Sequence, residues 1–218
     1  MSSYIELLSV LILLSAFLLI SCKKITSYIK MFRLQSLLIA IGALGVGIEN
    51  FIAHGHIDII VVTIIMIVLK IFYIPNTLNK LYENVEHIVE KDFFGNIPIL
   101  VMSCIGLVMV VYYGLKEVLG GESGVVYLEM VELVSVVLIG IVFMISRKKA
   151  IGQIIGFLVV ENGIFAVALF QTGGVPLIVD LGIFIDLLTG VLIMGLMVFK
   201  INKQFESTNI NKMRNLRG

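Results

Sequence analysis

Residues 4–21 read Tyr-Ile-Glu-Leu-Leu-Ser-Val-Leu-Ile-Leu-Leu-Ser-Ala-Phe-Leu-Leu-Ile-Ser, a run that is apolar almost from end to end. A helix needs about 20 such residues to cross the hydrocarbon core of a bilayer. Strands of a membrane barrel alternate over about ten residues, whereas this run is continuous and longer. Only a helix satisfies its own backbone hydrogen bonds in lipid, so the run predicts a transmembrane helix.

Comparable apolar runs recur along the remainder of the 218 residues. The hydrophobic fraction is 59%, the charged fraction is 14%, and the mean hydropathy is +1.09. Soluble domains contain about 45–50% apolar and about 25% charged residues, so this chain has too few polar residues for a water-facing surface. The prediction is an all-α, polytopic membrane helix bundle, a single domain over 1–218, with seven spans at about 4–21, 35–53, 57–74, 97–114, 125–146, 151–170 and 176–199.

The basic residues predict the orientation of these spans, because lysine and arginine collect in cytoplasmic loops. With seven spans, fourteen basic residues fall on one side, whereas Lys116 falls on the other and Lys70 lies within a span. An even number of spans would destroy this asymmetry. The N-terminus is therefore expected outside and the C-terminus in the cytoplasm. The fourteen are Lys23, Lys24, Lys30, Arg33, Lys80, Lys91, Arg147, Lys148, Lys149, Lys200, Lys203, Lys212, Arg214 and Arg217.

The longest connection, 75–96, is expected to be an amphipathic segment on the cytoplasmic surface. Leu78, Leu81, Val85 and Ile88 recur at helical spacing, with charged residues between them. The excess of acidic residues argues against anionic lipid and favours a protein partner. Residues 200–218 form a cytoplasmic tail in this interpretation.

Seven of the ionisable residues within the predicted spans are the candidate functional residues. A charge at mid-membrane costs roughly 2.5–3.5 kcal/mol on insertion scales. Such groups are therefore expected to face the bundle interior, to pair with one another, to hold protons or to contact water. They are Glu49, Lys70, Glu129, Glu132, Glu161, Asp180 and Asp186.

Glu161 and Asp186 are the predicted relay pair. Glu161 lies mid-span beside Asn162, with Gln153 about two turns earlier, and Asp186 lies mid-span in the next helix. The turn at 171–176 is short, so these helices are expected to be antiparallel neighbours with both acids at similar depth. Burial makes a carboxyl group harder to ionise, which suits a proton carrier. The alternative is a structural hydrogen bond between helices.

Glu49, Lys70, Glu129 and Glu132 are the further members of the predicted proton path, and Asn162, Gln153 and Asp180 are its supporting residues. Glu49 repeats, with Asn50, the Glu-Asn pair of 161–162. Lys70 is either a proton site or a lysine that snorkels to the nearby cytoplasmic surface. Glu129 and Glu132 share a helix face and either share a proton or form a solvated rim.

No cofactor is expected. The two cysteines lie far apart without a Cys-x-x-Cys motif, which leaves iron–sulfur and structural zinc sites unsupported. Neither a nucleophile–base pair nor a metal or haem ligand cluster is visible, so the chain is predicted to have no active site of its own. Its net charge of +1 gives no reason to expect a nucleic-acid partner.

One stretch, 146–163, carries a resemblance to a known family. It reads Ser-Arg-Lys-Lys-Ala-Ile-Gly-Gln-Ile-Ile-Gly-Phe-Leu-Val-Val-Glu-Asn-Gly and resembles hydrogenase-4 component E, a membrane subunit of formate hydrogenlyase-type, energy-converting nickel–iron hydrogenases. The similarity continues through 179–186, the tail at 209–218, and the region of Lys70 and Pro75. It covers the whole chain, with its strongest part over 146–218.

The last two predicted helices also resemble the K-type small subunit of respiratory complex I and of multisubunit cation/proton antiporters. Those proteins carry one buried glutamate in each helix of the pair. Asp186 falls on the second position, whereas this chain has Leu158 at the first, about one turn from Glu161.

The resemblance implies a non-catalytic subunit in a prokaryotic cytoplasmic membrane, without a redox centre. Its partners would be antiporter-like membrane subunits, a membrane anchor, and peripheral nickel–iron and iron–sulfur subunits. It would contribute to proton or sodium translocation coupled to hydrogen evolution. A purely structural linker of that complex and a free-standing proton-coupled transporter are the alternatives.

Overall fold

The computed structural model describes residues 2–55, 57–83, 96–118, 124–172 and 190. The predicted span at 176–199, most of the amphipathic segment at 75–96 and the tail at 200–218 lie outside the described residues, as do Asp180 and Asp186.

Within the described residues the chain is helical, without a strand. Six helical segments are long and apolar enough to cross a membrane, and one of them is continuous through α3, η1 and α4. The predicted all-helical class and the membrane character are confirmed at this level. The elements are α1 (Ser2–Ser21), α2 (Ile25–His54), α3 (Asp58–Met66), the π-helix η1 (Ile67–Tyr73), α4 (Ile74–Glu83), α5 (Ile97–Val118), α6 (Val125–Ser146) and α7 (Ala150–Thr172).

Helix α2 begins at Ile25, whereas the sequence predicted a span from 35. Thirty residues of helix reach about 45 Å, more than the roughly 30 Å hydrocarbon core requires. The extra turns carry Lys30, which is exposed, and Arg33, whose Nη2 donates to Asn76 Oδ1 at 3.4 Å. The polar residues that suggested a loop therefore lie on a helix that extends beyond the apolar core.

The helix through Lys70 also has no break at the predicted boundary of 75. Proline lacks an N–H and its ring crowds the carbonyl four residues earlier, here that of Ile71. The widened turns of η1, directly before Pro75, accommodate this conflict, as π-helical insertions do. The helix then continues through α4, where Leu78 is buried and Lys80 is exposed.

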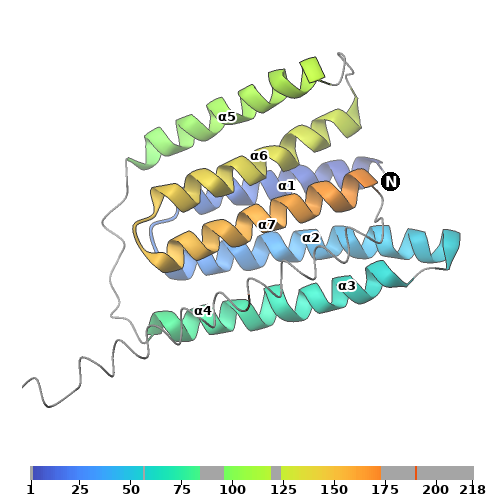
Figure 1. Cartoon of the computed structure of the whole chain (residues 1–218), viewed down its shortest axis with the longest axis horizontal. Helices are drawn as coiled ribbons and strands as arrows, with labels where there is room; N and C mark the ends of the chain where they lie inside the picture. Colours follow the sequence, from blue (N-terminus) through green and yellow to red (C-terminus); the bar gives the residue numbers. More distant parts are fainter. Residues whose placement is uncertain (1, 56, 84–95, 119–123, 173–189, 191–218) are drawn as a thin grey trace, which may run out of the picture.

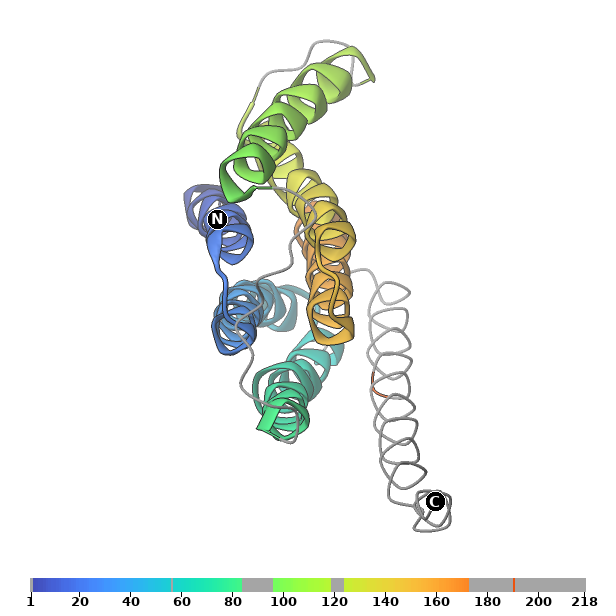
Figure 2. The ribbon, with the colours of Figure 1, turned by 90° about the vertical axis from the view of Figure 1, so that its left-hand side faces the viewer.

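The helices form a bundle with α5 and the α3–η1–α4 helix at opposite edges (Figures 1 and 2). The α1–α2 and α6–α7 hairpins lie between them: α1 packs on α6, and α2 packs on α7. One end of the bundle, where α1 and α6 finish, carries Lys23, Lys24, Lys148 and Lys149. We call it the basic end, and the other end is the far end.

Glycines set the spacing between α6 and α7. A Cβ on Gly140 would lie 2.9 Å from Val160 N, and one on Gly156 would lie 2.7 Å from Met144 Cα. A Cβ on Gly163 would lie 3.1 Å from the backbone nitrogen of Val137. The helices therefore approach backbone to backbone in one antiparallel register, as small residues permit, and this register places Glu161 level with Ile139.

Candidate functional site

The most concentrated group of buried polar side chains lies between α2, η1 and α7. Lys70 comes from the middle of η1, Glu161 and Asn162 come from α7, and Gln35 and Ser36 come from α2. Each of the five side chains is at most 4% exposed. We call these five residues the inner network.

An ion pair forms the centre of the inner network. Lys70 Nζ lies 2.8 Å from Glu161 Oε1, and it also donates a hydrogen bond to Asn162 Oδ1 at 3.1 Å. The ammonium group faces the ring of Phe165, and Nζ lies 5.8 Å from the ring centroid. The ammonium thus points into the bundle rather than toward the basic end.

Asn162 connects the ion pair to α2. Its Nδ2 donates to Ser36 Oγ at 3.0 Å and to Gln35 Oε1 at 3.3 Å, while its Oδ1 accepts from Lys70. Both ends of the amide are therefore engaged, and the amide orientation is determined by its neighbours. The inner network joins three helices through a continuous line of hydrogen bonds.

This arrangement suits a group that exchanges a proton. Removing a carboxylate and an ammonium from water is expensive, and each compensates the other only while both remain charged. Protonation of Glu161 would leave the Lys70 ammonium without that compensation, so the protonation state of one residue is coupled to that of the other. Asn162, Gln35 and Ser36 can reorient their hydrogen bonds around either state.

The structure brings together only part of the predicted site. Lys70, Glu161 and Asn162 are in contact, whereas Gln153 is exposed and donates from Nε2 to the backbone oxygen of Arg147 at 3.0 Å. The predicted partner of Glu161, Asp186, lies outside the described residues, as does Asp180.

Glu49 lies away from the inner network. It is exposed near the end of α2, thirteen residues beyond Ser36, which corresponds to about 20 Å along the helix. The repeated Glu-Asn pair of α2 and α7 therefore does not place two equivalent carboxylates at one depth.

A second group of polar side chains lies between α1 and α6, toward the far end. Glu129 is 4% exposed and Glu132 is half-buried, and Ser9 Oγ is hydrogen-bonded to Glu132 Oε2. Glu6, on α1, lies within electrostatic range of both glutamates. Glu129 is thus a buried group rather than part of a solvated rim.

Sequence reasoning missed several of these polar residues. Gln35, Ser36, Glu6 and Ser9 were not candidates, and Arg147 was counted as a loop charge. The Arg147 side chain is fully buried: Nη2 donates to the backbone oxygen of Ile20 at 3.0 Å, and the guanidinium lies over the rings of Tyr28 and Phe143. Its position one residue after a transmembrane helix gave no signal that it would turn inward.

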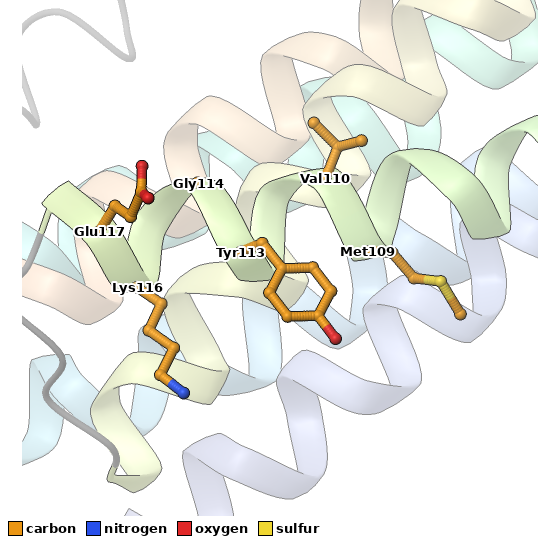
Figure 3. A pocket seen from close by; sticks show the side chains of 6 residues that line it. All are labelled: Met109, Val110, Tyr113, Gly114, Lys116 and Glu117. Carbon is orange, nitrogen blue, oxygen red and sulfur yellow. The ribbon is translucent and has the colours of Figure 1, made fainter.

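A surface hollow of about 700 Å³ follows the last turns of α5 (Figure 3). Its lining comes from that helix alone and includes the exposed residues Tyr113, Lys116 and Glu117. No group of three histidine, cysteine or acidic residues suited to a metal ion occurs among the described residues. The two cysteines, Cys22 and Cys104, are not joined in a disulfide.

A comparison with curated proteins finds a relative that matches part of the chain. The uncharacterised protein Rv0085 of Mycobacterium tuberculosis is 36% identical over 112 residues, which is 51% of this chain and 51% of that protein. The chain thus matches about half the length of this curated relative, whose name states no activity. No family model matches the chain, and no solved structure matches it.

Proposed function

We propose that this chain is a non-catalytic integral membrane subunit of an energy-converting nickel–iron hydrogenase complex, and that its inner network lies on the path of the translocated proton. The resemblance to hydrogenase-4 component E supports the assignment to this class of complex. The ion pair of Lys70 with Glu161, 2.8 Å long and buried, is the observation that supports the translocation role most directly.

The physical basis of the role is the cost of buried charge. An ionisable residue deep in a membrane helix usually belongs to a pathway for protons or ions. In the ion pair, arrival of a proton at Glu161 neutralises the carboxylate and releases the Lys70 ammonium, whose charge then favours departure of a proton on the other side. Asp186, the sequence-predicted partner of Glu161, is the proposed next group along the path.

The proposal includes the topology and partners expected from the sequence. The chain has seven spans, with the N-terminus outside and the basic end in the cytoplasm of a prokaryotic cell. It lies in the plasma membrane between antiporter-like subunits and the anchor of the peripheral nickel–iron arm. The chain holds no redox centre, and the complex translocates either protons or sodium ions.

The test compares Glu161→Gln and Asp186→Asn with Glu49→Gln in the assembled complex. Hydrogen evolution from an artificial electron donor is expected to stay close to the unmodified level in all three variants. Ion pumping into sealed vesicles is expected to fall at least tenfold in the first two and to remain unchanged in Glu49→Gln, because Glu49 is exposed and remote from the inner network. Undiminished pumping in both Glu161→Gln and Asp186→Asn would refute the proposal.

A structural linker is the second candidate, because the inner network ties α2, η1 and α7 together. In that case the same substitutions would lower the yield of assembled complex, and pumping per assembled complex would not change. A free-standing transporter would instead be active when the chain alone is reconstituted in liposomes.

A further inference from the structure

The polar group between α1 and α6 has hydrogen bonds that indicate a bound proton. Ser9 Oγ lies 2.9 Å from the backbone oxygen of Glu6 and is also hydrogen-bonded to Glu132 Oε2. A serine hydroxyl has a single proton to donate. An ionised Glu132 would have to share this one proton with the Glu6 carbonyl, whereas a proton on Glu132, donated to Ser9, leaves the Ser9 hydroxyl free to donate to Glu6.

Glu129 gives an independent indication. Its Oε1 atom is buried without a hydrogen-bond partner, in a side chain that is only 4% exposed. The charges that act on this carboxyl group are those of Glu6 and Glu132, both negative. A buried carboxylate oxygen without a donor and beside like charges is unfavourable, and a proton on one of the carboxyl groups relieves it.

Among the described residues, no lysine or arginine of α6 or α7 lies level with the two glutamates. The register of α6 and α7 places Glu129 and Glu132 level with Gln171 and Ala168, which do not titrate. The ionisable groups of α5 on the bundle side include the buried Cys104 and Tyr112, which packs against Tyr127. Helix α2 contains no lysine or arginine after Arg33, and Lys116 of α5 is exposed near the end of its helix.

The depth of this group relates it to the inner network. Glu161 is level with Ile139, and Glu132 lies seven residues nearer the far end, about 10 Å along α6. Glu129 lies one further turn in the same direction. The two polar groups therefore occupy successive depths across the bundle.

We propose that Glu6, Ser9, Glu129 and Glu132 form a second proton-binding site, which holds one exchangeable proton between α1 and α6 and opens toward the far end. The ligand is a proton rather than a metal ion, since no group of acids among the described residues is placed to surround a cation. Ser9 keeps a hydrogen bond to Glu132 in both states, so the proton is gained and lost without a change of helix packing. This proposal rests on the proposed function only for the direction in which the proton is exchanged.

Infrared difference spectroscopy of the full-length protein in lipid vesicles tests the site without hydrogenase activity. The spectrum between acidic and alkaline medium should contain the carbonyl band of a protonated carboxylic acid. Glu161 gives a band of its own, which Glu161→Gln removes. The band of the second site is expected to disappear in Glu132→Gln or Glu129→Gln and to persist in Glu161→Gln and Glu49→Gln. The milder Ser9→Ala variant should retain the band at a shifted frequency, and Ser9→Thr should restore the original frequency.

Two results would overturn the proposal. The first is that Glu132→Gln and Glu129→Gln both show the same carbonyl bands as the unmodified protein, or that the unmodified protein shows no such band at any pH. The second is an unshifted band in Ser9→Ala, which remains informative if the glutamine variants do not fold. Loss of pumping in Glu161→Gln together with either result would retain the proposed function and remove only this site.

Discussion

Lys70 and Glu161 illustrate how strongly one residue depends on another when both are buried. Each side chain is almost inaccessible, and the ammonium and the carboxylate are 2.8 Å apart. Removing one member of a buried ion pair typically costs about 3–5 kcal/mol, whereas replacing both by apolar side chains of similar volume is often neutral or stabilising.

We therefore expect Lys70→Met and Glu161→Met each to lower the stability of the purified protein by roughly 3–5 kcal/mol. The double variant should lose less than either single variant, because it leaves no uncompensated charge. Thermal unfolding in detergent, measured on all four proteins, gives the coupling energy. Additive losses in the double variant would mean that the two groups do not act as a pair.

The members of the inner network could be identified from the sequence, but their pairing could not. Glu161, Asn162 and Lys70 are conspicuous because charged and amide groups are rare in apolar spans. The partner of Glu161 depends on the rotation of η1, which is set by the π-helical turns before Pro75. Gln35 and Ser36 lie at the start of the span predicted at 35–53, next to Arg33, so hydropathy did not indicate that their side chains would be buried.

At the scale of elements, the α6–α7 contact determines the depth of every group on these two helices. Gly156→Ala is expected to destabilise the protein by about 1–3 kcal/mol, because the new methyl group would meet the Met144 backbone at 2.7 Å. Gly106→Ala, on α5, is the matched control. Nothing lies within 4 Å of its added Cβ, and alanine favours a helix by up to about 1 kcal/mol.

The thermal unfolding midpoint distinguishes these outcomes. It should fall in Gly156→Ala and stay level or rise in Gly106→Ala. Equal shifts in the two variants would contradict the backbone-to-backbone packing, and with it the 10 Å spacing between the two polar groups.

The existence of the described helices followed directly from hydropathy, and so did the ends of three of them, whereas the start of α2 did not. The described runs near 4–21, 125–146 and 151–170 coincide closely with α1, α6 and α7. Helix α2 extends further because Lys30 and Arg33 are compatible with a helix outside the hydrocarbon core. Hydropathy detects only the part of a helix that lies in lipid.

At the scale of the whole molecule, the distribution of charge separates the two ends of the bundle. The basic end carries exposed Lys148, and the far end carries exposed Lys116. If the basic end faces the cytoplasm, a membrane-impermeant thiol reagent added to intact cells should label Lys116→Cys. Lys148→Cys should be labelled only after the cells are permeabilised. If the predicted span at 176–199 also crosses the membrane, Lys212→Cys should, like Lys148→Cys, be labelled only after permeabilisation.

The two native cysteines are first replaced, as Cys22→Ser and Cys104→Ser, so that the reagent labels only the introduced cysteine. In the unmodified chain, burial raises the pKa of the Cys22 thiol and the nearby charge of Arg147 opposes the shift only in part. Because the thiolate is the reactive form, a raised pKa lowers the reactivity of Cys22 near neutral pH, and its labelling should increase as the pH rises.

Labelling of Lys148→Cys in intact cells would reverse the assigned orientation. Labelling of Lys212→Cys together with Lys116→Cys would instead require an even number of spans.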